Sequence, residues 1–133
     1  MAKRLELVPM GTRVEASGDG AACDISGSAT RTFLLNLEIT DVLEQESLDV
    51  SIWGSADGAE FGKMPLLKLP QRFYRGNTKL VLDLTLKPEV KFIRARWDLN
   101  RWGRVAPTPM FQFGLLAEEI AAFPAPKPRA VPA

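Results

Sequence analysis

One stretch indicates the architecture of the whole chain: Val90-Lys-Phe-Ile-Arg-Ala-Arg-Trp-Asp-Leu-Asn-Arg-Trp-Gly-Arg104. Successive side chains of an extended strand point to opposite faces. From residue 93 onward, the apolar side chains therefore share one face and the charged side chains share the other. The apolar face carries Ile93, Ala95 and Trp97, and the opposite face carries Arg94, Arg96 and Asp98. This pattern predicts a strand with one buried face, with Trp97 in the core.

Several other segments show the same alternation, with turn-forming residues between them. We expect strands near residues 5–7, 13–16, 22–25, 33–40, 48–53, 78–86 and 111–118, and an edge segment bracketed by prolines at 64–70. Four leucines of segment 78–86 are expected to face inward: Leu80, Leu82, Leu84 and Leu86. Leu34 and Val81 interrupt the alternation. No segment has an apolar period of 3.6 residues over three turns, so we predict an all-β protein, an antiparallel β-sandwich of the jelly-roll kind.

The size and composition fit a single soluble domain without disulfides. The chain has 133 residues, of which 46% are hydrophobic and 25% are charged, as in ordinary globular proteins. No apolar run approaches the ~20 residues that cross a bilayer, and Glu6 and Pro9 interrupt the start before the apolar core of a signal peptide develops. We expect a domain at about residues 3–120 and a protein of the cytoplasm or of an assembled particle.

The last residues, 121–133, are rich in proline and predict an extended tail rather than a helix or strand. Two interpretations stay open for this tail. It is either a solvated end or an arm that lies along a neighbouring subunit, because a proline-rich chain loses little entropy when it docks.

The charge and the lack of histidine narrow the possible chemistry. Lys and Arg number 17 against 16 Asp and Glu, a formal net charge of +1, so bulk charge gives no reason to expect binding to nucleic acid or to a membrane. Without histidine, the chain alone supplies neither an imidazole base nor a histidine-ligated metal. The single cysteine, Cys23, excludes an internal disulfide, and we expect a buried or half-buried thiol there.

Carboxylates are the remaining catalytic candidates. The best acid–base pair would join Asp98 to Glu118 or Glu119, but nothing in the sequence brings these residues together. We therefore expect ordinary solvated carboxylates and no catalytic residue. Three aspartates lack the regular spacing of a calcium loop: Asp19, Asp24 and Asp57. We predict no metal site and no cofactor, with a calcium ion held between loops left open.

The segment Val50-Ser-Ile-Trp-Gly-Ser-Ala-Asp-Gly-Ala-Glu-Phe61 resembles the strand–Ser-x-Asp-Gly–aromatic hairpin of discoidin-like, galactose-binding-like jelly rolls. Phe92-Ile-Arg-Ala-Arg-Trp97 is similar to a later strand of that family. The same pair of features resembles small β-sandwich structural proteins of tailed phages. The resemblance covers residues 48–97 and implies a sandwich fold, but it transfers no binding residue. One cysteine also cannot form the terminal disulfide that closes many discoidin-like domains.

Arginine and aromatic residues form the candidate binding site: Trp53, Arg72, Tyr74, Arg94, Arg96, Arg101, Trp102 and Arg104. Planar guanidinium groups beside aromatic rings suit sugars, phosphates, nucleobases or a protein partner. The alternative is that the strand arginines form cross-strand ion pairs with residues such as Asp83 or Glu38.

Three functional hypotheses follow from these residues. The first is a non-catalytic β-sandwich that acts through protein contacts or self-association, as a structural or accessory subunit of a larger assembly such as one derived from a phage. The second is a carbohydrate-binding module that stacks a glycan on Trp53, Tyr74 or Trp102. The third is a small enzyme that uses carboxylates.

Overall fold

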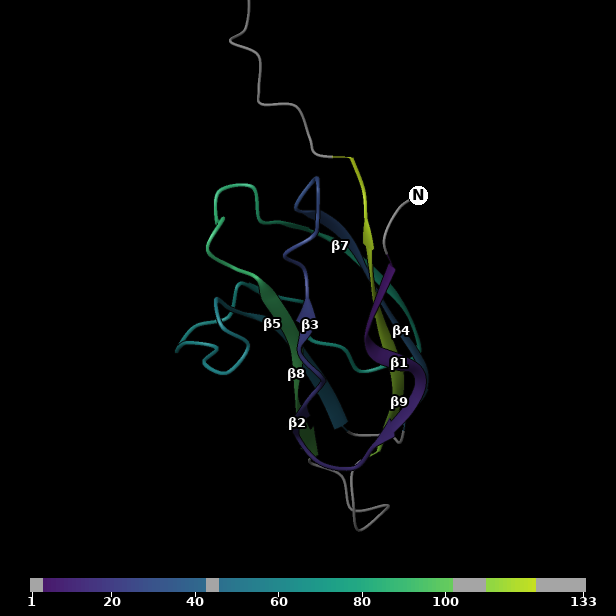
Figure 1. Ribbon diagram of the computed structural model, residues 1–133. Coiled ribbons are helices and arrows are strands. Elements are labelled where there is room, and N and C mark those ends of the chain that lie inside the picture. The colour runs from purple at the N-terminus through teal and green to yellow at the C-terminus, as the bar shows by residue number, and fades with distance from the viewer. Residues whose placement is uncertain (1–3, 43–45, 102–109, 122–133) are drawn as a thin grey trace, which may run out of the picture.

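The computed structural model describes residues 4–42, 46–101 and 110–121, and the secondary structure of this part consists of strands alone. Nine strands follow one another along the chain (Figure 1): β1 (Arg4–Val14), β2 (Gly18–Asp19), β3 (Cys23–Asp24), β4 (Thr32–Val42), β5 (Glu46–Ser55), β6 (Leu67–Lys68), β7 (Gly76–Asp83), β8 (Phe92–Arg101) and β9 (Phe111–Glu119). No helix in the described part is long and apolar enough to span a membrane.

The strands form two antiparallel sheets that pack as a sandwich (Figure 1). The first sheet has the order β1-β9-β4-β7, and the second has the order β2-β8-β5-β6, with β3 also paired to β8. From β4 onward the long strands β4, β5, β7, β8 and β9 alternate between the two sheets, as in a jelly roll. The predicted antiparallel β-sandwich is therefore confirmed.

The core lies between the sheets and consists of the inward side chains of the long strands. On β4 and β9 every second residue is buried: Phe33, Leu35, Leu37 and Ile39, then Phe111, Phe113, Leu115 and Ala117. The second sheet contributes Leu48, Val50, Ile52, Ile93 and Ala95. The alternation in the sequence therefore predicted the buried faces of β4, β5, β8 and β9 correctly.

Trp97 faces the core but is only half-buried. Its ring packs edge-on against Phe113 of the other sheet, with 5.7 Å between ring centroids. The indole N–H donates a 3.0 Å hydrogen bond to the carbonyl oxygen of Ala16, in the connection between β1 and β2. Trp97 thus joins the two sheets and one of their connections, and the register predicted from residues 93–98 holds.

The prediction that Leu86 faces the core is wrong, because its side chain is 93% exposed. Strand β7 ends at Asp83, whose carboxylate accepts hydrogen bonds from the N–H and hydroxyl of Thr85. The Lys87 N–H then donates to the Leu84 carbonyl oxygen at 3.0 Å. This turn breaks the two-residue period before Leu86, so its side chain leaves the core.

The connection from β7 to β8 is fixed by Arg31, which has a φ of +54°. Its Nε donates to the Leu84 carbonyl at 3.2 Å, and its Nη2 donates to the carbonyls of Lys87 and Val90, both at 2.7 Å. One guanidinium group therefore holds the turn that delivers the chain to the start of β8.

The sequence predicted two short strands near residues 5–7 and 13–16, and the structure joins them in one long edge strand, β1. Its pairing with β9 shifts register between Glu6 and Val8 and again between Val8 and Thr12. Pro9 and Gly11 lie in the second irregular stretch, where Gly11 has a φ of +80°. Residues 122–133, which include most of the predicted tail, lie outside the described residues.

Candidate functional site

The outer face of the second sheet presents the strand arginines. Arg94 lies opposite Trp53 in the β5–β8 pair, and Arg96 lies opposite Ser51 on one side and Asp19 on the other. Their side chains point away from the core because their neighbours Ile93 and Ala95 point into it. The sequence pattern thus placed these arginines on the correct face.

Each arginine stacks on an aromatic ring. The Arg94 guanidinium carbon lies 4.0 Å from the centroid of the Phe61 ring, and that of Arg96 lies 5.7 Å from the centroid of Trp53. The Trp53 indole N–H donates to Ser51 Oγ at 2.9 Å. We call Trp53, Phe61, Arg94 and Arg96 the arginine–aromatic face.

The predicted ion pairs of these arginines with Asp83 or Glu38 are wrong. Asp83 belongs to β7 and Glu38 to β4, so both lie in the first sheet. The acidic neighbour of Arg94 is Asp19, with 4.0 Å between Arg94 Nη2 and a carboxylate oxygen. The buried Nε atom of Arg94 has no hydrogen-bond partner among the described residues. One donor of this side chain is therefore left unsatisfied.

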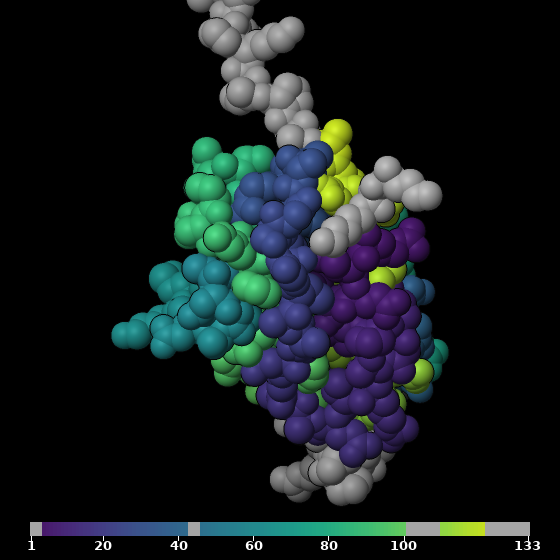
Figure 2. Space-filling model, in the orientation of Figure 1, coloured from purple at the N-terminus to yellow at the C-terminus, as the bar shows by residue number. Residues whose placement is uncertain are grey.

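Phe61 was not among the candidate residues, although the resembling hairpin motif contains it. It lies in the connection between β5 and β6, which projects from the side of the second sheet (Figure 2). Asp57 shapes the start of this connection. The N–H groups of Glu60 and Ala59, together with the Ser55 hydroxyl, lower the pKa of Asp57 to about 2. Phe61 itself is buried, with 6% of its surface exposed beneath Arg94.

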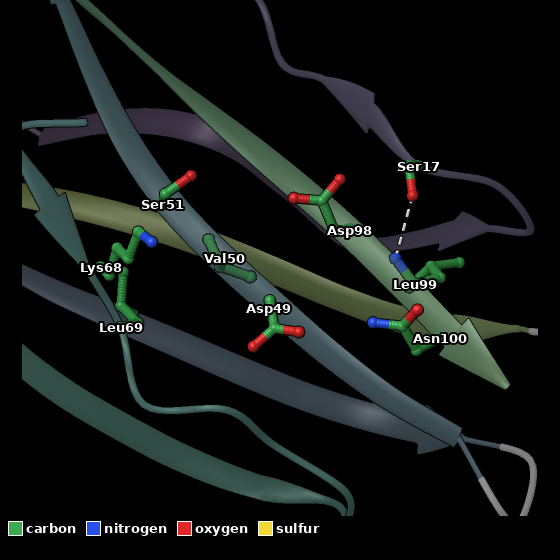
Figure 3. A pocket seen from close by; sticks show the side chains of 9 residues that line it. All are labelled: Ser17, Asp49, Val50, Ser51, Lys68, Leu69, Asp98, Leu99 and Asn100. Atoms are coloured by element: carbon green, nitrogen blue, oxygen red, sulfur yellow. Dashed lines mark hydrogen bonds between the residues drawn. The ribbon is translucent and has the colours of Figure 1, made fainter. Parts of the chain in front are cut away.

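A polar hollow of about 450 Å³ lies further along the same sheet (Figure 3). Asp49 and Asp98 face each other directly across β5 and β8 at its centre, with Lys68 and Ser17 at its sides. Gln71 Nε2 donates to Asp49 at 3.1 Å. Like charges that lie directly opposite each other destabilise a strand pair, so Asp49 and Asp98 weaken the pairing of β5 with β8.

No group of three or more acidic or cysteine side chains suited to a metal occurs in the described part of the chain.

The segment from Arg72 to Arg75 forms a second candidate region before β7. Arg72 has a structural role, since its backbone pairs with Leu48 and its Nε donates to Thr78 Oγ1 at 2.6 Å. Tyr74 is 80% exposed beside a hollow of about 230 Å³. Arg75 bonds Asp41 at 2.9 Å and holds the pKa of that carboxyl below its usual range. None of the residues that line this hollow belongs to the arginine–aromatic face.

The remaining candidates are only partly described. Arg101 is the last residue of β8, and its backbone lies opposite Glu46. Trp102 and Arg104 lie outside the described residues.

The carboxylates of the catalytic hypothesis lie on different sheets. Asp98 is on the second sheet, whereas Glu118 and Glu119 are on β9 of the first. Glu119 accepts hydrogen bonds from the Thr30 N–H at 2.9 Å and from the Ser28 hydroxyl at 2.7 Å. These bonds lower the pKa of Glu119. Glu119 therefore ties the loop before β4 to β9.

No known protein family model matches the chain, and no curated protein matches it either. Among solved structures, the chain is similar to one described as the structure of infectious bursal disease virus Gt strain, with a TM-score of 0.42 and 12% sequence identity. The match covers 89% of this chain and 30% of the viral chain, so this chain spans less than a third of its length. These comparisons assign no family.

Proposed function

We propose that this chain is a non-catalytic β-sandwich that acts through protein contacts, as a structural or accessory subunit of a larger assembly. The observation that carries this proposal is the arginine–aromatic face. Arginine and tryptophan are enriched among the residues that dominate binding energy at protein interfaces. Here both guanidinium groups are already stacked on rings, so they lose little conformational freedom when a partner binds.

The guanidinium groups of Arg94 and Arg96 indicate the chemistry of the partner, because both point away from the core on the outer face of the second sheet. A guanidinium donor is best satisfied by a carboxylate or a carbonyl oxygen. Asp19 is the acidic neighbour of Arg94, at the 4.0 Å limit of an ion pair. A partner that offers acidic or carbonyl groups to this face would bond Arg96, which is exposed, and the accessible part of the half-buried Arg94.

Two features of the chain support a role without catalysis. Histidine is absent from the sequence, and the carboxylates of the best catalytic pair lie on different sheets. The resemblance of residues 48–97 to phage structural proteins points to the same class of function. The fold does not decide the question, because jelly rolls occur in viral capsid proteins and in lectins alike.

The test compares the parent with the double variant Arg94→Ala/Arg96→Ala, and uses Arg13→Ala, on the opposite edge of the sandwich, as the control. Proteins captured by the parent are purified and titrated against all three forms. We expect the double variant to bind at least tenfold more weakly, about 1.4 kcal/mol. It should stay folded, with a small fall in melting temperature because both stacks on aromatic rings are lost. Equal binding by the parent and the double variant would exclude this face as the contact surface.

A carbohydrate-binding module is the second candidate, and one observation favours it. Tyr74 is 80% exposed beside a hollow, and exposed rings of this kind stack on sugars. Trp53 is less suited to stacking a glycan, because the Arg96 guanidinium lies over its ring. A glycan array measured alongside light scattering separates the two functions. A glycan signal that is lost in Tyr74→Ala would replace the protein-contact proposal.

A further inference from the structure

Strand β7 leaves one of its edges unpaired in the described part of the chain. The Leu84 N–H donates to the Arg31 carbonyl, which shows that even-numbered residues here bond to the strand on the β4 side. In an antiparallel pair the next residues turn their N–H and C=O groups the other way. Those of Lys79, Val81 and Asp83 therefore point away from β4. No hydrogen bond between described residues reaches them.

The other sheet edges are protected by devices that prevent strand pairing. Strand β1 has two register shifts and contains Pro9. Strands β2, β3 and β6 have two residues each, and Pro65 and Pro70 flank β6. By contrast, β7 has eight residues, lacks proline, and pairs with β4 without a register shift. It is the long, regular edge in the described structure.

An apolar patch adjoins this edge on the outer face of the first sheet. Leu34 of β4 lies directly opposite Val81, and these are the two residues that break the apolar–polar alternation in the sequence. Leu116 of β9 lies diagonally beyond them, opposite Asn36. All three leucine and valine side chains are half-buried, although their strand neighbours point into the core. The two breaks in the sequence pattern thus meet at one place on the surface.

We propose that β7 pairs antiparallel with β7 of a second copy of this chain, about a twofold axis at Val81. This register sets Val81 against Val81 and Lys79 against Asp83, the latter twice because the pair is symmetric. All of these residues direct their backbone groups to the free edge, so the hydrogen-bonding pattern is satisfied. The apolar patches of the two copies become continuous across the axis. A self-complementary charge pattern thus identifies a second copy as the occupant.

This inference is independent of the arginine–aromatic face, which lies on the other sheet. It concerns self-association, whereas the proposed function concerns a different partner on a different surface. The two proposals can therefore fail separately.

The test is a charge exchange followed by sedimentation velocity over a range of protein concentrations. Lys79→Glu sets like charges opposite each other at both symmetric positions, and Asp83→Lys does the same. We expect each single variant to weaken dimerisation by about tenfold, and the double variant Lys79→Glu/Asp83→Lys to restore it. Arg13→Glu makes the same change of charge at the opposite edge of the first sheet and should dimerise like the parent.

Asp83 also bonds Thr85, so Asp83→Lys is accompanied by a melting curve. Lys79→Glu removes no hydrogen bond between described residues and tests the interface by itself. A parent that stays monomeric at all concentrations would overturn the proposal. Dimerisation unaffected by Lys79→Glu would do so as well, because it would place the interface elsewhere, such as in the tail. Failure of the double variant to recover would disprove the register.

Discussion

Replacement of Trp97 by alanine tests the central contact between the sheets. Replacement of a fully buried tryptophan by alanine lowers the free energy of unfolding by about 3–5 kcal/mol. Trp97 is half-buried, so the lower end of that range applies. Its hydrogen bond to the Ala16 carbonyl adds about 1 kcal/mol. We expect Trp97→Ala to lower the free energy of unfolding by about 3–4 kcal/mol, a large part of the 5–15 kcal/mol typical of a domain.

Trp97→Phe separates the two contributions, because it keeps a ring against Phe113 but removes the N–H donor. We expect it to lose about 1–2 kcal/mol, from the missing hydrogen bond and the smaller ring, because water can bond the exposed Ala16 carbonyl instead. Urea unfolding with a shared slope for all three proteins gives both differences. A loss below about 1 kcal/mol for Trp97→Ala would refute the conclusion that this side chain joins the sheets.

Two further perturbations follow from contacts of single residues. A β-carbon at Gly114 would lie 2.5 Å from the Cα of Met10. Gly114→Ala should therefore lower the free energy of unfolding by about 1–3 kcal/mol. Gly27 has open space around it, so the control variant Gly27→Ala should melt like the parent. The folded-state pKa values of Glu119 and Asp57 are both lowered, that of Asp57 to about 2. The stability that each group contributes is therefore present above its ordinary pKa, 4.5 for Glu119 and 3.8 for Asp57, and is lost as pH falls through its folded-state pKa. Unfolding measured against pH should show this loss and a shallower slope for Glu119→Gln, and an equal slope would contradict the role of Glu119.

The sequence predicted which residues face the core because burial acts locally on every second residue of a strand. The prediction that Ile93 and Ala95 point inward needed no knowledge of the neighbouring strands. The same holds for the outward direction of Arg94 and Arg96. Leu86 was mispredicted because the Asp83–Thr85 bonds end the strand earlier than the alternation does. A side-chain bond to the backbone can therefore override the apolar pattern.

Strand pairing could not be predicted, since any two alternating strands present compatible faces. The ion pairs proposed for the arginines failed for this reason, because Asp83 and Glu38 belong to the other sheet. Phe61 contacts Arg94 from the long connection between β5 and β6, and no local sequence pattern links these two residues. The breaks at Leu34 and Val81 were visible in the sequence, but their meaning needed the register that sets them side by side.

The position of β9 has a consequence for the time course of folding. This last strand, Phe111–Glu119, lies between β1 and β4 in the first sheet. During synthesis β1 and β4 leave the ribosome with the place between them empty, and they acquire their shared neighbour only after residue 119 has emerged. Folds dominated by such distant pairings fold slowly, within milliseconds to seconds. We expect the first sheet to assemble in one late step, with its apolar faces exposed to chaperones until then.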